Sequence, residues 1–120
     1  MRLRKTLPAD IEQVIASGDV EAVARAVARC EIGAYLRGSA YEPRLMHFPA
    51  SEEITDFLLA RGEDVNSRDR YQRTPIHARV QSRCLDQIPL LIARGGDINA
   101  RDTSDQTALF GVVERFPVAD

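Results

Sequence analysis

The chain has 120 residues, enough for one domain with a single core and too few for two independent domains. Its net charge of -2, with 44% hydrophobic and 28% charged residues, is typical of a globular protein and excludes a disordered chain or a strongly basic nucleic-acid binder. No apolar run reaches the about 18 residues of a membrane span and no signal peptide is visible, so we expect a cytoplasmic protein without membrane contact, unless another route exports it.

The N-terminal quarter of the sequence predicts a pair of short helices. Apolar residues at helical spacing favour helices over 7–17 and 20–30, with Gly18 at the tight turn and Asp19 as N-cap of the second helix. Residues 31–44 contain glycines and a proline but no sustained period, so we expect a loop there.

The middle of the chain predicts a second helical region. A short helix is expected at 45–48, and a longer one should begin after an N-cap at Ser51 and end at Gly62. The polar stretch 63–73 has Asn and Asp at positions typical of turns, so we expect a loop.

The third predicted helical pair has the clearest start. Thr74 followed by Pro75 is typical of an N-cap and a first helical residue. A partner helix is expected over 85–95 with Asp86 as its cap. A loop over 96–106 and a new helix from 107 follow.

Two stretches at a spacing of 33 residues are nearly the same. "LLARGEDVNSRD" at 58–69 and "LIARGGDINARD" at 91–102 share eight of twelve positions. Self-similarity at a fixed period is typical of helical pairs that stack on copies of themselves, because one pair cannot bury both of its apolar faces.

The residues at 69–101 resemble the ankyrin repeat family through "TPIH" at 74–77, "LLI" at 90–92, Gly95 and "DINA" at 97–100. The resemblance implies an all-α solenoid of stacked antiparallel helix pairs with β-turn loops, as a single domain over 1–120. Its expected units are an N-terminal capping pair at 7–30, a degenerate repeat at 31–68, a full repeat at 69–101 and a partial repeat at 102–120.

Residues that recur at this spacing are expected to hold the fold. They would cap helices, allow left-handed helix ends or, as the resemblance implies, join one loop to the next through a histidine or asparagine. The expected structural residues are Gly62, Asn66, Asp69, Thr74, Pro75, His77, Gly95, Asn99, Asp102 and Thr107.

The sequence contains no pattern typical of a catalytic, metal or cofactor site. Cys30 and Cys84 form no CxxC pair, and His47 and His77 are not part of a Cys/His cluster with metal-ligand spacing. We therefore expect a protein that is not an enzyme and has no cofactor. The alternative is a thiol-dependent enzyme or redox protein that uses Cys84 or Cys30.

The resemblance implies binding of another protein through a concave face and the loop tips. Nucleic-acid binding is not expected, because the arginines alternate with acidic residues and the net charge is negative. The role would be that of an adaptor, an effector or an immunity protein. A bacterial source is also expected, because Lys5 is the only lysine and a GC-rich bacterial genome can produce such an excess of arginine over lysine. Arg79 is expected to reach the groove or pair with an acid of a neighbouring unit. The candidate partner-binding residues are Arg70, Tyr71, Arg73, Arg79, Gln81, Ser82, Arg101, Thr103, Ser104, Gln106, Phe110 and Glu114.

Overall fold

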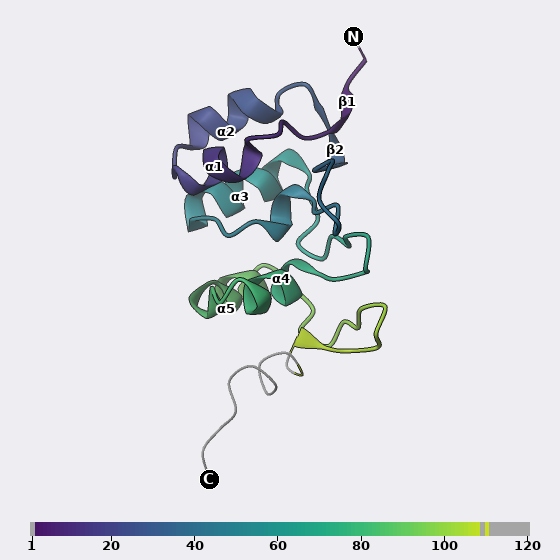
Figure 1. The fold of residues 1–120 in the computed structure, drawn as a ribbon. Coiled ribbons are helices and arrows are strands. Elements are labelled where there is room, and N and C mark those ends of the chain that lie inside the picture. Colours follow the sequence, from purple (N-terminus) through teal and green to yellow (C-terminus); the bar gives the residue numbers. More distant parts are fainter. Residues whose placement is uncertain (1, 109, 111–120) are drawn as a thin grey trace.

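The computed structural model describes residues 2–108 and 110, and in this part of the chain five α-helices accompany a two-stranded sheet (Figure 1). In chain order the elements are β1 (Arg4–Thr6), α1 (Ile11–Ala16), α2 (Val20–Val27), β2 (Cys30–Tyr35), the 3-10 helix η1 (Leu45–His47), α3 (Glu52–Arg61), α4 (Pro75–Gln81), the 3-10 helix η2 (Leu85–Gln87) and α5 (Ile88–Ala93). The strands and the first three α-helices form the N-terminal end of the molecule, and α4 and α5 lie beyond α3.

The prediction of an all-α ankyrin-repeat solenoid is wrong. β1 and β2 pair in parallel, with Arg4 opposite Cys30 and Thr6 opposite Tyr35, and the register is irregular between these pairs. Residues 30–35, expected at the end of a helix and the start of a loop, therefore form a strand. The described chain is a small, compact mixed α/β protein and not an extended stack of helix pairs.

The sheet forms because the chain before α1 runs beside the chain after α2. The main-chain N–H of Arg4 donates to the carbonyl of Arg29 at 2.7 Å, and that of Leu7 donates to Tyr35 at 2.8 Å. Leu7 and Ala34 are buried, so both segments are also held by the core. β1 has only three residues and no alternation of apolar and polar residues, so the sequence shows no pattern that predicts this strand.

Several helix ends agree with the prediction, whereas α1 begins at Ile11 and not at residue 7, and α2 ends at Val27 and not at residue 30. Asp19 accepts hydrogen bonds from two main-chain N–H groups of α2, Ser51 caps α3, and Thr74 caps α4 with Pro75 in its first turn. Gly62 ends α3 with a φ of 115°, a left-handed conformation that glycine adopts without steric cost. Each of these ends depends on residues close in sequence, so the prediction of the ends is correct although that of the overall fold is wrong.

The predicted cap of the helix at 85–95 is wrong. Residues 85–87 form η2, and α5 follows with Gln87 at its N-cap position and no side-chain cap, so Asp86 has no capping role. The Gln87 carboxamide oxygen instead accepts from the main-chain N–H of Ala50 at 3.1 Å and from Nε of Arg79 at 2.8 Å. Gln87 thus connects η2 to two other segments.

One hydrophobic core extends through the described residues from α1 to α5. The core side chains that are at most 1% exposed are Ile11, Ile15, Val23, Val27, Leu45, Met46, Ile54, Leu58, Ile76 and Leu91. Burial of each such side chain stabilises the fold by roughly 1.5–3 kcal/mol. Because every α-helix contributes at least one of them, the helices are packed into a single unit.

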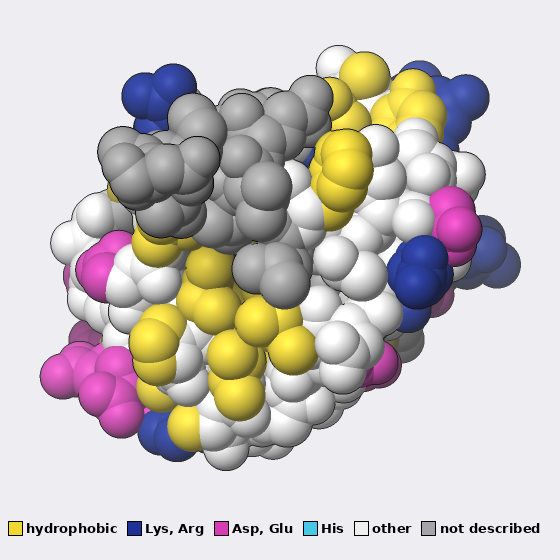
Figure 2. All heavy atoms as spheres, turned by 90° about the horizontal axis from the view of Figure 1, so that it is seen from below, with side chains coloured by type: hydrophobic (Ala, Val, Ile, Leu, Met, Phe, Trp, Pro, Cys, Tyr) yellow, Lys and Arg dark blue, Asp and Glu magenta, His cyan; other side chains and the backbone are white. Residues whose placement is uncertain are grey.

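Some apolar side chains remain on the surface at the C-terminal end. Figure 2 shows hydrophobic side chains on the face seen from below in Figure 1. Leu85, Ile92 and Phe110 are 37%, 43% and 48% exposed. Most of the helix predicted from 107 lies outside the described residues.

Arg79 is buried in α4, in contrast to both expectations for it. Its side chain is among the most buried in the described chain, at 1% exposed. Nε donates to Gln87, and Nη1 donates to the main-chain carbonyl of His47 at 2.8 Å. Burial lowers the pKa of the guanidinium to about 10, so it stays charged at neutral pH. Arg79 joins α4 to η1 and η2 and does not form part of a binding surface.

We predict that Arg79→Met lowers the free energy of unfolding by about 1–3 kcal/mol, because the buried carbonyl of His47 loses its hydrogen-bond donor. Chemical denaturation followed by circular dichroism measures the change. Arg70→Met is the matched control, since Arg70 is exposed and should change stability by less than about 0.5 kcal/mol. Equal stability of the two variants would contradict the role assigned to Arg79.

Candidate functional site

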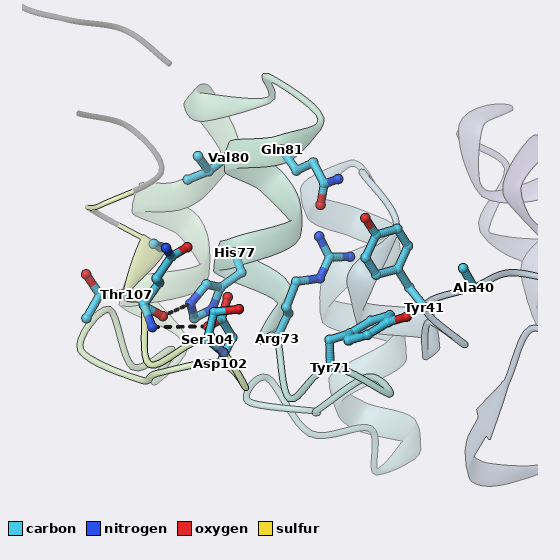
Figure 3. A pocket seen from close by; sticks show the side chains of 12 residues that line it. Ala40, Tyr41, Tyr71, Arg73, His77, Val80, Gln81, Asp102, Ser104 and Thr107 are labelled. Atoms are coloured by element: carbon cyan, nitrogen blue, oxygen red, sulfur yellow. Dashed lines mark hydrogen bonds between the residues drawn. The ribbon is translucent and has the colours of Figure 1, made fainter. Parts of the chain in front are cut away.

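Two neighbouring hollows lie beside α4; the larger one, between α4 and the loops at 40–41, 71–73 and 102–108, is shown in Figure 3. Their volumes are about 370 Å³ and 240 Å³, and Tyr41, Arg73 and Gln81 line both. We call the combined surface the loop groove; its other lining residues include Ala40, Tyr71, His77, Val80, Ser82, Asp102, Ser104, Gln106, Thr107 and Ala108. The groove brings together segments that are more than 60 residues apart in sequence.

The loops at 69–73 and 102–106 have the same hydrogen bonds. In each, the first aspartate's N–H donates to the carbonyl four residues later, Asp69 to Arg73 at 3.1 Å and Asp102 to Gln106 at 3.0 Å. Oδ1 of each aspartate also accepts from the main-chain N–H groups two and four residues later. The aspartates therefore fix the loop backbones, which present different side chains to the groove.

An aromatic and arginine cluster forms the centre of the loop groove. The rings of Tyr41 and Tyr71 lie edge to face, with centroids 5.2 Å apart. The guanidinium of Arg73 lies over the Tyr41 ring at 4.0 Å from its centroid, a favourable cation–π geometry. Nε of Arg73 donates to Oδ2 of Asp69 at 2.9 Å. In Figure 3 the end of Arg73 points toward Tyr41 and Gln81.

His77 closes the other side of the groove. Its Nδ1 accepts from the main-chain N–H of Thr74 at 3.2 Å, so the ring proton is on Nε2. Nε2 then donates to the carbonyl of Gln106 at 2.9 Å. This bond fixes the loop at 102–106 against α4 and leaves no free nitrogen on His77 for proton transfer.

His47, the last residue of η1, makes the same pair of bonds, which the sequence did not reveal. Nδ1 accepts from the N–H of Arg44 at 3.1 Å, and Nε2 donates to the carbonyl of Arg73 at 2.8 Å. Burial lowers the pKa of His47 to about 4, and the bond to Arg73 opposes that shift. One sequence signal could have revealed this role: His47 lies three residues after Arg44, the same spacing that separates His77 from Thr74.

The structure brings half of the predicted partner-binding residues into the loop groove. These are Tyr71, Arg73, Gln81, Ser82, Ser104 and Gln106. Arg70, Arg101, Thr103 and Phe110 are exposed but line neither hollow, Arg79 is buried, and Glu114 lies outside the described residues. Tyr41 was missed because it lies in a stretch without a sequence pattern.

Several of the expected structural residues shape turns or connect loops in the described chain. Gly62 and Gly95 have φ of 115° and 99°. Asn66 joins its loop to the next, since Nδ2 donates to the carbonyl of Gly95 at 3.1 Å and Oδ1 accepts from the N–H of Asp97 at 2.8 Å. Asn99 is exposed, and Oγ1 of Thr107 accepts from the N–H of Phe110 at 3.4 Å.

The two cysteines lie apart from the groove lining. Cys30 is buried in β2, and burial raises the pKa of its thiol despite the opposing charges of Arg61 and Arg4. Cys84, between α4 and η2, is partly exposed, and Sγ donates to the carbonyl of Ser82 at 3.6 Å. Within the described residues no group of three or more His, Cys, Asp or Glu side chains could hold a metal ion.

No family model matches the chain, and comparison with curated proteins found no significant match. Within residues 2–108 and 110, no helix is both long and apolar enough to span a membrane. The interpretation of the loop groove therefore depends on its own residues.

We predict that His47 makes stability depend on pH. The unfolded histidine takes up a proton below its ordinary pKa of 6.5, whereas the folded one does so only near 4. Its contribution is therefore complete above pH 6.5 and is lost as the pH falls toward 4, at about 1.4 kcal/mol per pH unit in that range. Denaturation of the wild type and His47→Gln between pH 7 and 4.5, taken as a difference so that other groups cancel, measures it. Parallel curves would show that the ring is not held neutral.

We also predict that iodoacetamide alkylates Cys84 in the folded protein about tenfold or more faster than Cys30, because the Cys30 thiol is buried and its pKa is raised. Mass spectrometry of peptides after timed labelling measures both rates, and the unfolded chain gives the control in which the rates converge. Labelling of Cys30 at the faster rate would instead favour thiol chemistry at β2.

Proposed function

We propose that this chain binds another protein through the loop groove. The observation that carries the proposal is the exposed tyrosine pair at its centre: Tyr41 and Tyr71 are 37% and 41% exposed, yet their rings are already packed edge to face. Tyrosine and arginine are enriched among the residues that dominate binding energy at interfaces. Because the pair is ordered before binding, little side-chain entropy is lost when a partner covers it.

Arg73 adds a directional polar anchor beside the tyrosines. Asp69 holds Nε and the Tyr41 ring holds the face of the guanidinium, so the side chain has one defined position. No hydrogen bond from its terminal nitrogens to another described residue is present, which leaves these donors for a carbonyl or carboxylate of the partner.

The shape of the groove suits side chains of a protein surface. Hollows of about 370 Å³ and 240 Å³ each accommodate one or two side chains. Gln81, Ser82 and Ser104 give the edges hydrogen-bonding groups, and Val80 and Ala108 give the floor of the larger hollow apolar surface.

We predict that Tyr71→Ala and Tyr41→Ala each reduce the recovery of a binding partner by about tenfold or more, since truncation of an anchor tyrosine commonly costs 2 kcal/mol or more. The measurement is affinity capture from an extract of the source cells followed by quantitative mass spectrometry. Ile92→Ala is the matched control, because Ile92 has a similar exposure of 43% but lies on α5, outside the groove.

Thermal melting of the three variants separates loss of binding from loss of folding. Partners that are recovered equally with the wild type, both tyrosine variants and Ile92→Ala would remove the loop groove from consideration as the binding surface.

A further inference from the structure

A cluster of positive side chains near the N-terminus lies outside the lining of the loop groove. Arg2, Arg4, Lys5, Arg25 and Arg29 are all exposed, and we call them the N-terminal basic surface. Arg4, Arg25 and Arg29 line a hollow of about 260 Å³ that has no acidic side chain in its lining. Arg4 also lines a second hollow together with Arg2 and Lys5. Among the described residues that line this hollow, Glu31 is the one acidic side chain.

This positive charge has no acidic partner among the described residues, although Arg25 lies in the last turn of α2, where a cation favours the helix dipole. Among the described residues, none of the five side chains forms an ion pair or donates a side-chain hydrogen bond. The C-terminal end of α2, which would attract a cation, already has one in Arg61, whose Nη2 donates to the carbonyls of Val27 at 2.8 Å and Cys30 at 2.6 Å. Arg25 and Arg29 remain for an external anion.

The same end of the molecule has an open sheet edge. Within residues 2–108 and 110, β1 has β2 as its one neighbour, so its outer edge is unpaired. β2 has further partners, because Gly33 N–H donates to Glu63 at 3.2 Å and Tyr35 forms a bridge with Arg44. An unpaired strand edge presents main-chain donors and acceptors to another extended chain. Leu3 and Ile32, 44% and 52% exposed, add apolar contact area nearby.

We propose that the N-terminal basic surface binds an acidic, extended peptide segment of a partner protein that adds to the free edge of β1. Its carboxylates pair with Arg4, Arg25 and Arg29, and its main chain pairs with β1. Neither hollow is lined by an aromatic side chain on which a nucleic-acid base could stack, and a lipid headgroup offers no main chain to pair with the strand. The observations therefore favour a peptide.

The test uses the full chain and a fluorescein-labelled peptide in which glutamate alternates with valine, with binding followed by fluorescence anisotropy. Three comparisons separate charge from strand pairing: the same peptide with glutamine in place of glutamate, the same peptide N-methylated at alternate residues, and the double variant Arg25→Glu, Arg29→Glu. The control variant Arg37→Glu, Arg70→Glu makes the same charge change at exposed arginines outside the N-terminal basic surface. Thermal melting checks that both variants fold.

We expect the glutamate peptide to bind and its affinity to fall as salt is added. The glutamine peptide, the N-methylated peptide and the Arg25→Glu, Arg29→Glu variant should each bind about fivefold or more weakly, whereas the control variant should bind like the wild type. Absence of binding, or affinity that neither charge nor N-methylation changes, overturns the proposal. Tighter binding of phosphatidylserine vesicles or of an oligothymidylate than of the peptide overturns it in favour of a membrane or nucleic-acid surface.

Discussion

The geometry of the loop groove depends on how Arg73 is held. Its carbonyl accepts a hydrogen bond from His47, its N–H donates to Asp69, and its side chain bonds to the same carboxylate and covers the Tyr41 ring. The carbonyl also accepts from the N–H of Asp69, so five contacts from three segments determine the position of Arg73. Because Tyr71 lies two residues before Arg73 and packs on Tyr41, fixing Arg73 also sets the positions of the two exposed rings.

Buried charged groups connect the rest of the molecule in a similar way. Glu63 accepts from the N–H of Gly33 at 3.2 Å and pairs with Arg61, and burial raises the pKa of its carboxyl. Arg61 in turn donates to the carbonyl of Val27 at the end of α2 and to that of Cys30 at the start of β2. Among the described residues no buried side-chain nitrogen or oxygen lacks a partner. A buried charge that is fully bonded gives a segment one allowed position, because any shift would leave the charge unpaired at high cost.

Sequence reasoning succeeded where the determining interaction is local and failed where it is not. Ser51 and Thr74 were identified as caps because their partners lie within the next three residues. The pairing of β1 with β2 joins residues more than 25 positions apart, and a left-handed Gly33 interrupts the alternation of β2. Arg79 was misplaced for the same reason, since its acceptors on His47 and Gln87 belong to other elements.

The repeated sequence at a spacing of 33 residues also has a local explanation. It encodes the same helix ending twice, since the N–H groups of Glu63 and Gly96 donate to the carbonyls of Leu58 and Leu91. The last residue of each copy is the aspartate that holds the loop that follows, and the likeness does not extend to a repeated architecture. Where the first loop has Tyr71 and Arg73, the second has Ser104 and Gln106, and all four side chains line the groove. Asp69 and Asp102 accept hydrogen bonds from the main-chain N–H groups at these positions, so the loop conformation does not depend on which side chains they have. The binding that we propose for the groove therefore depends on the positions that the loop conformation does not constrain.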